Sequence, residues 1–175
     1  MDRKQAENYV FAAIAIITIL VFIITPAYPS GGIGYRIDDF FNQYLFGNGY
    51  YKPSNYPFAA KVTNSISVVL AVVTGFFMGI WRRNDVIVSL MPKNFWLWIL
   101  VVLGLVIIAV LVSIYPQEFS VSKGRLRMTE TFHNNPVSFM VVMLAKTICI
   151  YAPVRFLVSL TFYLLIRKDK SNRAI

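Results

Sequence analysis

The sequence predicts an all-α fold: a polytopic membrane helix bundle with four transmembrane helices, formed by residues 1–175 as a single integral membrane domain. Of the 175 residues, 57% are hydrophobic and 14% are charged, whereas soluble domains usually carry about 25% charged residues. The hydrophobic residues also cluster into long runs without charge, separated by short basic stretches. Because roughly 20 consecutive apolar residues cross about 30 Å of hydrocarbon, such runs are typical of membrane-spanning helices.

The first predicted span covers residues 9–28, an apolar run that prolines bring to an end. Two basic residues precede it, as in a secretory signal peptide. Against cleavage, Asp2 and Glu7 nearly neutralise this leader, and Pro26 lies in the candidate cleavage region. We therefore expect an uncleaved helix.

A loop rich in Gly, Pro, Tyr and Asn follows the first span. Within it, Tyr35 to Phe46 form a short amphipathic pattern that we expect to be helical, starting near Asp38 and Asp39 because acidic residues favour a helix N-terminus. Its aromatic residues suit the headgroup region of a bilayer. This pattern predicts a short helix lying along the membrane surface.

The remaining three predicted spans are residues 58–81, 95–115 and 137–166. Basic pairs close the first and the last of these, and the middle one is entered through Trp96 and Trp98. Trp and Tyr at such ends are typical of the interfacial aromatic belts of membrane proteins. No internal repeat relates the two halves, which argues against the repeat-built transporter folds.

The basic residues also predict the orientation, because cytoplasmic flanks of membrane helices collect Lys and Arg. The N-terminus, the second loop and the C-terminal tail are basic, whereas the longer first loop has only Arg36 and Lys52; the third loop departs from this bias with Lys123, Arg125 and Arg127. We expect both termini in the cytoplasm. The net charge of +9 has the same explanation, so nucleic acid is not an expected partner.

The second span carries a continuous face of small residues, spaced four apart: Ala59, Thr63, Ser67, Ala71, Gly75 and Gly79. Positions four apart stack along one helix face, and small residues let helices approach closely in lipid. Two interpretations stay open, namely packing against the protein's own helices and a groove offered to another protein. If the groove serves a partner, Gly75→Leu or Gly79→Leu should abolish its binding and leave insertion intact.

The fourth span contains two cations, Lys146 and Arg155. Counting inward from Arg167 at about 1.5 Å per residue, Arg155 lies roughly 18 Å deep and Lys146 roughly 31 Å away, near the far boundary. Lys146 is therefore expected to extend to the headgroups. Arg155 has no acidic residue in any predicted span to pair with, although Pro153 frees carbonyl groups that could accept its hydrogen bonds. A structural role and a partner-facing role are equally open for Arg155.

Catalytic chemistry finds little support in the sequence. The eight acidic residues all fall in predicted loops or termini, His133 is the single histidine, and Cys149 is the single cysteine, in an apolar run where we expect it to pack. No phosphate-binding glycine loop or hydrolase motif is present. We therefore expect no catalytic residue, metal site or cofactor. Proton-coupled transport normally needs an intramembrane carboxylate or histidine, so recognition is the remaining task.

Three segments, residues 4–11, 56–62 and 118–125, resemble a known family: the immunity proteins of pore-forming colicins of the colicin A and colicin B group. The first segment is similar to that family's Lys/Ala/Asn-rich lead into Tyr-x-Phe, the second to a Pro-x-x-(Thr)-Lys-Val segment, and the third to a Glu-Leu-Thr-Thr-x-Gly pattern. Asn64-Ser65-Ile66-Ser67 stands where the family has a Lys-Thr-Ala-Pro element.

The resemblance implies a multi-pass protein of the bacterial inner membrane with four spans and both ends cytoplasmic. It also implies a function, which is to protect the toxin-producing cell by binding the membrane-inserted helices of a pore-forming colicin before the channel opens. The small-residue face, the buried cations and the basic third loop are the expected partner-binding features: Ser67, Ala71, Gly75, Gly79, Lys146, Arg155, Lys123, Arg125 and Arg127.

Two other classes of function remain as alternatives. An entry-exclusion protein, or an accessory protein of a conjugation or secretion apparatus, would be similarly small and multi-spanning and would act through its cytoplasmic tail and loops. A small transporter or membrane enzyme is disfavoured because the spans lack acidic residues.

Overall fold

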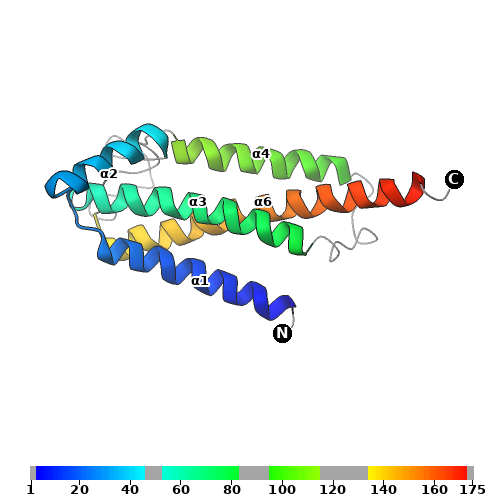
Figure 1. Ribbon diagram of the computed structural model, residues 1–175, viewed down its shortest axis with the longest axis horizontal. Coiled ribbons are helices and arrows are strands. Elements are labelled where there is room, and N and C mark those ends of the chain that lie inside the picture. The colour runs from blue at the N-terminus through cyan, green and yellow to red at the C-terminus, as the bar shows by residue number, and fades with distance from the viewer. Residues whose placement is uncertain (1–2, 46–52, 83–94, 115–133, 173–175) are drawn as a thin grey trace, which may run out of the picture.

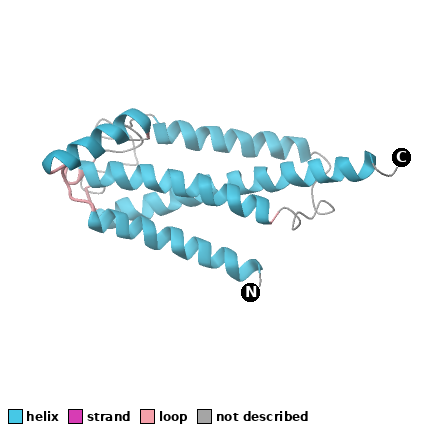
Figure 2. Cartoon of the chain, viewed as in Figure 1, coloured by secondary structure: helices cyan, strands magenta, loops and turns pink. Residues whose placement is uncertain are grey.

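The computed structural model describes residues 3–45, 53–82, 95–114 and 134–172, and within these ranges the protein consists of helices joined by short loops and contains no strand (Figure 2). The predicted all-α fold is therefore confirmed. The described helices are α1 (Arg3–Ile24), α2 (Gly31–Tyr44), α3 (Pro57–Trp81), α4 (Phe95–Ile114) and α6 (Pro136–Asn172).

Three of these helices are long and apolar enough to cross a membrane, over Gln5–Ile24, Pro57–Trp81 and Pro136–Phe162. The protein is thus a membrane-spanning protein. Four spans were predicted, and three of the described helices meet the criterion for a span. α4 (20 residues) forms at the expected third span, and the continuously described apolar stretch within it, Ile99–Ile108, is too short by itself to count as a span.

α3 and α6 lie side by side and run parallel at the centre of the bundle (Figure 1). Near their beginnings, the Ser54 hydroxyl donates a hydrogen bond to Asn134 Oδ1 at 3.1 Å. Near the end of α3, the Ser159 hydroxyl donates to the Gly79 carbonyl at 2.9 Å. Since both ends of α3 meet α6 in the same order, this pair forms the frame on which the other helices pack.

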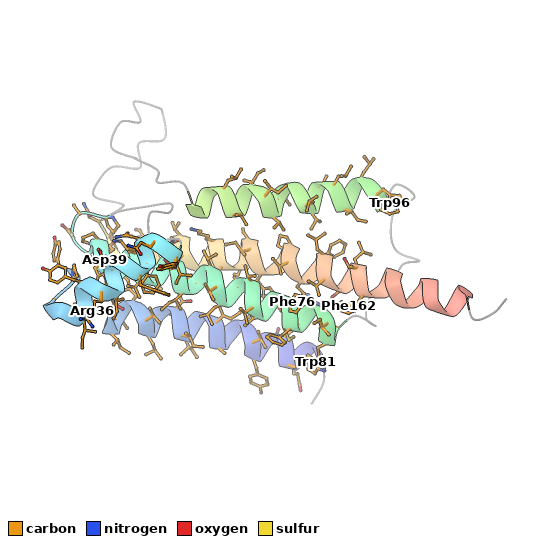
Figure 3. All side chains as sticks on the ribbon, turned by 45° about the horizontal axis from the view of Figure 1, so that its top comes forward. Arg36, Asp39, Phe76, Trp81, Trp96 and Phe162 are labelled. Carbon is orange, nitrogen blue, oxygen red and sulfur yellow. The ribbon has the colours of Figure 1, made fainter. Side chains whose placement is uncertain are left out.

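α1 and α4 pack on opposite sides of this central pair (Figure 1). α1 is antiparallel to α3, because the Phe58 amide donates to the Ala27 carbonyl at 3.0 Å at one end and Arg82 pairs with Glu7 at the other. Trp96, at the start of α4, lies at the same end of the bundle as Trp81, at the end of α3 (Figure 3). The first residues of α1 and the last turns of α3 and α6 therefore share one end.

An aromatic cluster fastens α1, α3 and α6 at the opposite end. The ring centroids of Phe22, Tyr56 and Phe139 lie 5.3 to 5.6 Å apart. Aromatic pairs at this separation stabilise a fold by about 0.5–1.5 kcal/mol beyond the area that they bury. Burial raises the pKa of the Tyr56 hydroxyl to about 12.

The predicted short surface helix corresponds to α2, but the start of α2 differs from the prediction. It starts at Gly31 rather than near Asp38, and Gly31 has a φ of +67°, which L residues rarely adopt. Asp38 lies inside α2, where its carboxylate accepts a hydrogen bond from Lys61 Nζ of α3 at 2.6 Å. Phe41 is buried against Phe58 and Val62 of α3. One face of α2 is thus anchored to α3, and its other aromatic residues stay exposed.

Candidate functional site

The small-residue face of α3 is buried against α6. Thr63, Ser67 and Ala71 are each at most 2% exposed, and both glycines of this face contact α6 backbone and side chains. In the structure this face packs against a helix of the same chain, which is the first of the two interpretations that the sequence leaves open. The face is therefore an interhelical contact, and it is not a groove on the surface of the bundle.

Gly79 marks the closest approach of the two helices. A Cβ atom added at Gly79 would lie 2.7 Å from Val158 Cβ and 2.9 Å from the Arg155 carbonyl oxygen. A Cβ at Gly75 would meet the Tyr151 carbonyl at 3.1 Å and Val154 at 3.2 Å. Since even one methyl group does not fit at Gly79 without movement of α6, the absence of a side chain there is what allows the parallel packing.

Arg155 pairs with an acidic residue, contrary to the expectation that none is available. Its Nη1 atom lies 2.5 Å from Glu7 Oε1, and Glu7 Oε2 pairs with Arg82. The Tyr151 hydroxyl lies 3.5 Å from Glu7 Oε1 and donates to it. Glu7 belongs to α1 rather than to a loop or free terminus. One carboxylate thus joins α1, α3 and α6 through two guanidinium groups and a phenol, which we call the Glu7 cluster (Glu7, Arg82, Tyr151 and Arg155).

The Glu7 cluster lies near the end of α3. Arg155 is level with Gly79, two residues before the last residue of α3, Trp81. α6 continues for 17 residues beyond Arg155, to Asn172, about 25 Å of helix. α6 thus extends well past the end of α3, and the depth of Arg155 in the bilayer stays a prediction.

Lys146 is placed further inside than expected. Instead of extending to the headgroups, its Nζ atom donates a hydrogen bond to Asn64 Oδ1 at 2.5 Å. Asn64 is the eighth residue of α3, so this contact lies about 10 Å inside the bundle. A buried cation is costly unless it is paired or hydrogen-bonded, and this amide supplies a ligand from the neighbouring helix. Both expected partner-facing cations, Lys146 and Arg155, thus bind residues of their own chain.

The basic residues of the third loop, Lys123, Arg125 and Arg127, lie outside the described residues. Sequence reasoning missed Glu7 and Arg82 as members of a polar cluster. Their pairing could have been found from topology, because an antiparallel arrangement of the first two spans brings the start of one beside the end of the other. The participation of Tyr151 and Arg155 depends on the register of α6, for which the sequence gives no separate signal.

A lateral groove separates α1 from α6 over part of their length. It has a volume of about 430 Å³ and is lined by Phe11, Ala12, Ile14, Ala15, Leu144, Thr147, Ile148 and Tyr151. The lining is almost entirely apolar. The Thr147 hydroxyl is already bonded to the Met143 carbonyl at 2.7 Å, and the Tyr151 hydroxyl points to the Glu7 cluster. The groove is therefore suited to an apolar occupant.

A second lateral surface is the outward face of α4, which carries an open glycine. Large apolar side chains are 45–63% exposed along this face: Leu97, Leu100, Val101, Ile108 and Leu111. Gly104 lies between them at helical spacing, and a Cβ added there would meet nothing within 4 Å. The space beside Gly75 and Gly79 is occupied by α6, whereas the space beside Gly104 is open. We call this open space between the neighbouring large side chains the notch.

These features define an α-helical membrane protein in which Glu7, Lys146 and Arg155 of the spanning helices bind side chains of neighbouring helices. Among the described residues, no group of three His, Cys, Asp or Glu side chains is placed to hold a metal ion. No protein-family model matches the chain, and no significantly similar protein was found among curated proteins or solved structures.

Proposed function

We propose that the protein is an immunity protein of the bacterial inner membrane, which protects a colicin-producing cell by binding the membrane-inserted helices of a pore-forming colicin. The proposal is supported by the resemblance of residues 4–11, 56–62 and 118–125 to that family. It is also supported by the internal pairing of the charged groups described in the spanning helices. Such a bundle presents apolar lateral surfaces to its surroundings, and these are suited to recognising another helix in lipid.

In this proposal α4 is the fourth span and both termini are cytoplasmic. The full length of α4, 20 residues, gives about 30 Å of helix, which matches the hydrocarbon thickness. An antiparallel α4 connects the end of α3 to the start of α6 across the membrane. The basic residues near the N-terminus, after α3 and in the tail then lie on one side, as the bias of cytoplasmic flanks requires.

The observation that carries the proposal is the open notch at Gly104. In lipid, helices associate through close packing because the hydrophobic effect does not distinguish a neighbouring helix from acyl chains. A glycine that packs against nothing in its own chain leaves room for the backbone of a second helix. The large side chains on either side of Gly104 would then flank the incoming helix and enlarge the contact.

The test is protection of cells that express the protein against a panel of pore-forming colicins, with nuclease colicins as controls. Gly104→Leu fills the notch, and we expect it to reduce protection against the cognate colicin at least about tenfold with unchanged membrane abundance. Gly32→Leu is the matched control, because a Cβ at Gly32 in α2 also meets nothing within 4 Å. Full protection by Gly104→Leu would exclude the notch, and no protection against any pore-forming colicin would overturn the proposed function.

A further inference from the structure

α2 is inclined to the bundle and does not lie flat across its end. The first turn of α2 lies beyond the start of α3, and its last turn lies beside α3 (Figure 1). Phe41, in the second half of α2, packs against Phe58 and Val62 of α3, and Leu45 and Ile66 pack at the edge of this cluster. Ile66 is the tenth residue of α3, about 13 Å of helix from its start. The end of α2 is therefore level with residues inside a membrane-spanning helix.

The contact of Asp38 with Lys61 marks the level at which α2 crosses the membrane boundary. α3 has 25 residues, about 37 Å of helix, which exceeds the roughly 30 Å of hydrocarbon by about 7 Å. With Trp81 in the aromatic belt of the opposite boundary, the hydrocarbon begins near Lys61, about 6 Å of helix from Pro57. Lys61 Nζ lies 2.6 Å from the Asp38 carboxylate, and Asp38 is the eighth of the 14 residues of α2. About half of α2 therefore lies on each side of this boundary.

The exposed side chains of α2 form two separate faces. The apolar face has large side chains that are 40–76% exposed and follow one another at spacings of four and three residues: Ile33, Ile37, Phe40 and Tyr44. The polar face has exposed side chains at the same spacings: Arg36, Asp39 and Gln43. Positions three and four apart share one side of a helix. An amphipathic helix of this kind inserts about 5–10 Å into the boundary between headgroups and acyl chains.

We propose that α2 is inserted obliquely among the lipids of the leaflet in which α3 begins, with its start among the headgroups and the side chains of Phe40 and Tyr44 among the acyl chains. Lipid hydrocarbon is the partner of the apolar face, because the second half of α2 packs beside a spanning helix below the level of Lys61. A helix lying along the membrane surface, as the sequence predicts, would instead hold all its residues at one depth. The proposal uses no residue of α4, so it does not depend on the proposed function.

Spin labels on α2 measure this inclination directly. Cys149 is the single cysteine of the chain, so Cys149→Ala gives a background in which Ile33→Cys and Tyr44→Cys can each be labelled. The whole protein would be reconstituted in phosphatidylcholine vesicles, where accessibility to oxygen relative to a water-soluble nickel chelate reports the depth of each label. About 16 Å of helix separates the two positions, and we expect the label at residue 44 to lie at least about 5 Å deeper than the label at residue 33. Phe40→Cys is a second deep position if Tyr44→Cys does not fold.

Gln43→Cys is the matched control, because Gln43 is exposed on the polar face and is next to Tyr44 in the chain. Its label should be more accessible to the nickel chelate than the label at residue 44. Equal depths at residues 33 and 44 would overturn the proposal and assign α2 to the membrane surface. Equal nickel accessibility at residues 43 and 44 would contradict it by placing both faces in water. Low accessibility to oxygen and nickel alike at residue 44 would also exclude lipid, since protein would then cover the apolar face, and dependence of this protection on protein concentration would identify a second copy of the chain.

Discussion

α6 meets its two neighbours α3 and α1 in opposite ways. Against α3 it packs without room for a methyl group at Gly79, along a face of small residues. Against α1 it leaves a groove of about 430 Å³, and the two helices are joined at its end by Glu7 and by the Phe11–Tyr151 ring pair, with centroids 4.7 Å apart. The first contact depends on the shape of the backbone, and the second on a few side chains.

This difference determines which substitutions each contact tolerates. A tightly packed interface responds to every added atom, because close-packed interiors cannot absorb extra volume. A contact that contains a groove accepts added volume, but it depends on the few side chains that join the two helices, the Glu7–Arg155 ion pair at one end and the Phe22–Phe139 ring pair at the other. Substitutions on the α3 side should therefore act through added volume, and those on the α1 side through lost charge.

The largest effect is expected at Gly79. Gly79→Leu places four carbon atoms where a Cβ alone would lie 2.7 Å from Val158, so we expect the free energy of unfolding to fall by more than about 3 kcal/mol and the folded protein to be largely lost. Membrane abundance and unfolding in detergent would measure this. Loss of protection with normal abundance would instead support the partner groove that the sequence alone left open.

Alanine substitutions at three glycines sharpen the comparison. Gly79→Ala should destabilise the protein by about 1–3 kcal/mol and Gly75→Ala by less, because the added Cβ would meet neighbours at 2.7 Å and 3.1 Å, respectively. Gly104→Ala should be neutral or stabilising by up to about 1 kcal/mol, since its Cβ meets nothing and Ala favours the helix. An order other than this one in unfolding midpoints would contradict the packing of α3 on α6.

On the α1 side, the next largest effect is expected from loss of the shared carboxylate. Glu7→Gln removes the carboxylate with which both Arg82 and Arg155 pair. We expect a loss of about 2 kcal/mol, less than the roughly 3–5 kcal/mol for a fully buried pair, because all three side chains keep some exposure. Arg155→Leu should cost less than Glu7→Gln, because the pair of Glu7 with Arg82 survives it. Equal losses of unfolding free energy in Glu7→Gln and Arg155→Leu would mean that Glu7 does not stabilise the bundle through both arginines.

The sequence predicted the helices well, because their signal is local. Apolar runs between prolines and basic pairs place the ends of α3 and α4 within one residue and those of α1 and α6 within six, and the four-residue spacing of small side chains correctly marks a closely packed face. The amphipathic α2 was also expected, although its start was not. Gly31 begins that helix with a backbone conformation that the sequence pattern around Asp38 did not indicate.

The polar contacts were predicted poorly, because they depend on the register between helices. The sequence pattern offers Arg155 no acidic partner, yet the packing of α1 brings Glu7 Oε1 to 2.5 Å from its Nη1 atom. Lys146 was expected to extend outward, yet a residue of α3, Asn64, lies within 2.5 Å of its amine. Such partners, separated by about 80 residues, follow only from three-dimensional packing.

A smaller effect is expected at the contact of α2 with α3. Asp38→Asn removes the ion pair with Lys61. Because the side chain of Asp38 is 22% exposed and that of Lys61 is 12% exposed, we expect the free energy of unfolding to fall by about 1 kcal/mol. Asp39→Asn is the matched control, because the side chain of Asp39 is exposed and the change in charge is the same. Thermal unfolding in detergent would compare them. Similar midpoints for the two variants would show that the ion pair does not stabilise the bundle.

The smallest effect on the bundle is expected from removing the tail from Lys168 onward. α6 reaches the end of α3 near Ser159, whose hydroxyl contacts Gly79, so the residues after Lys168 extend beyond α3 and the free energy of unfolding should change by less than about 0.5 kcal/mol. Protection against a colicin should persist, because recognition inside the bilayer uses surfaces such as the face of α4. An accessory protein of a conjugation or secretion apparatus, acting through its cytoplasmic tail, would lose its activity in the same variant. The truncation therefore separates the two functions while leaving the tight and the open contacts of α6 unchanged.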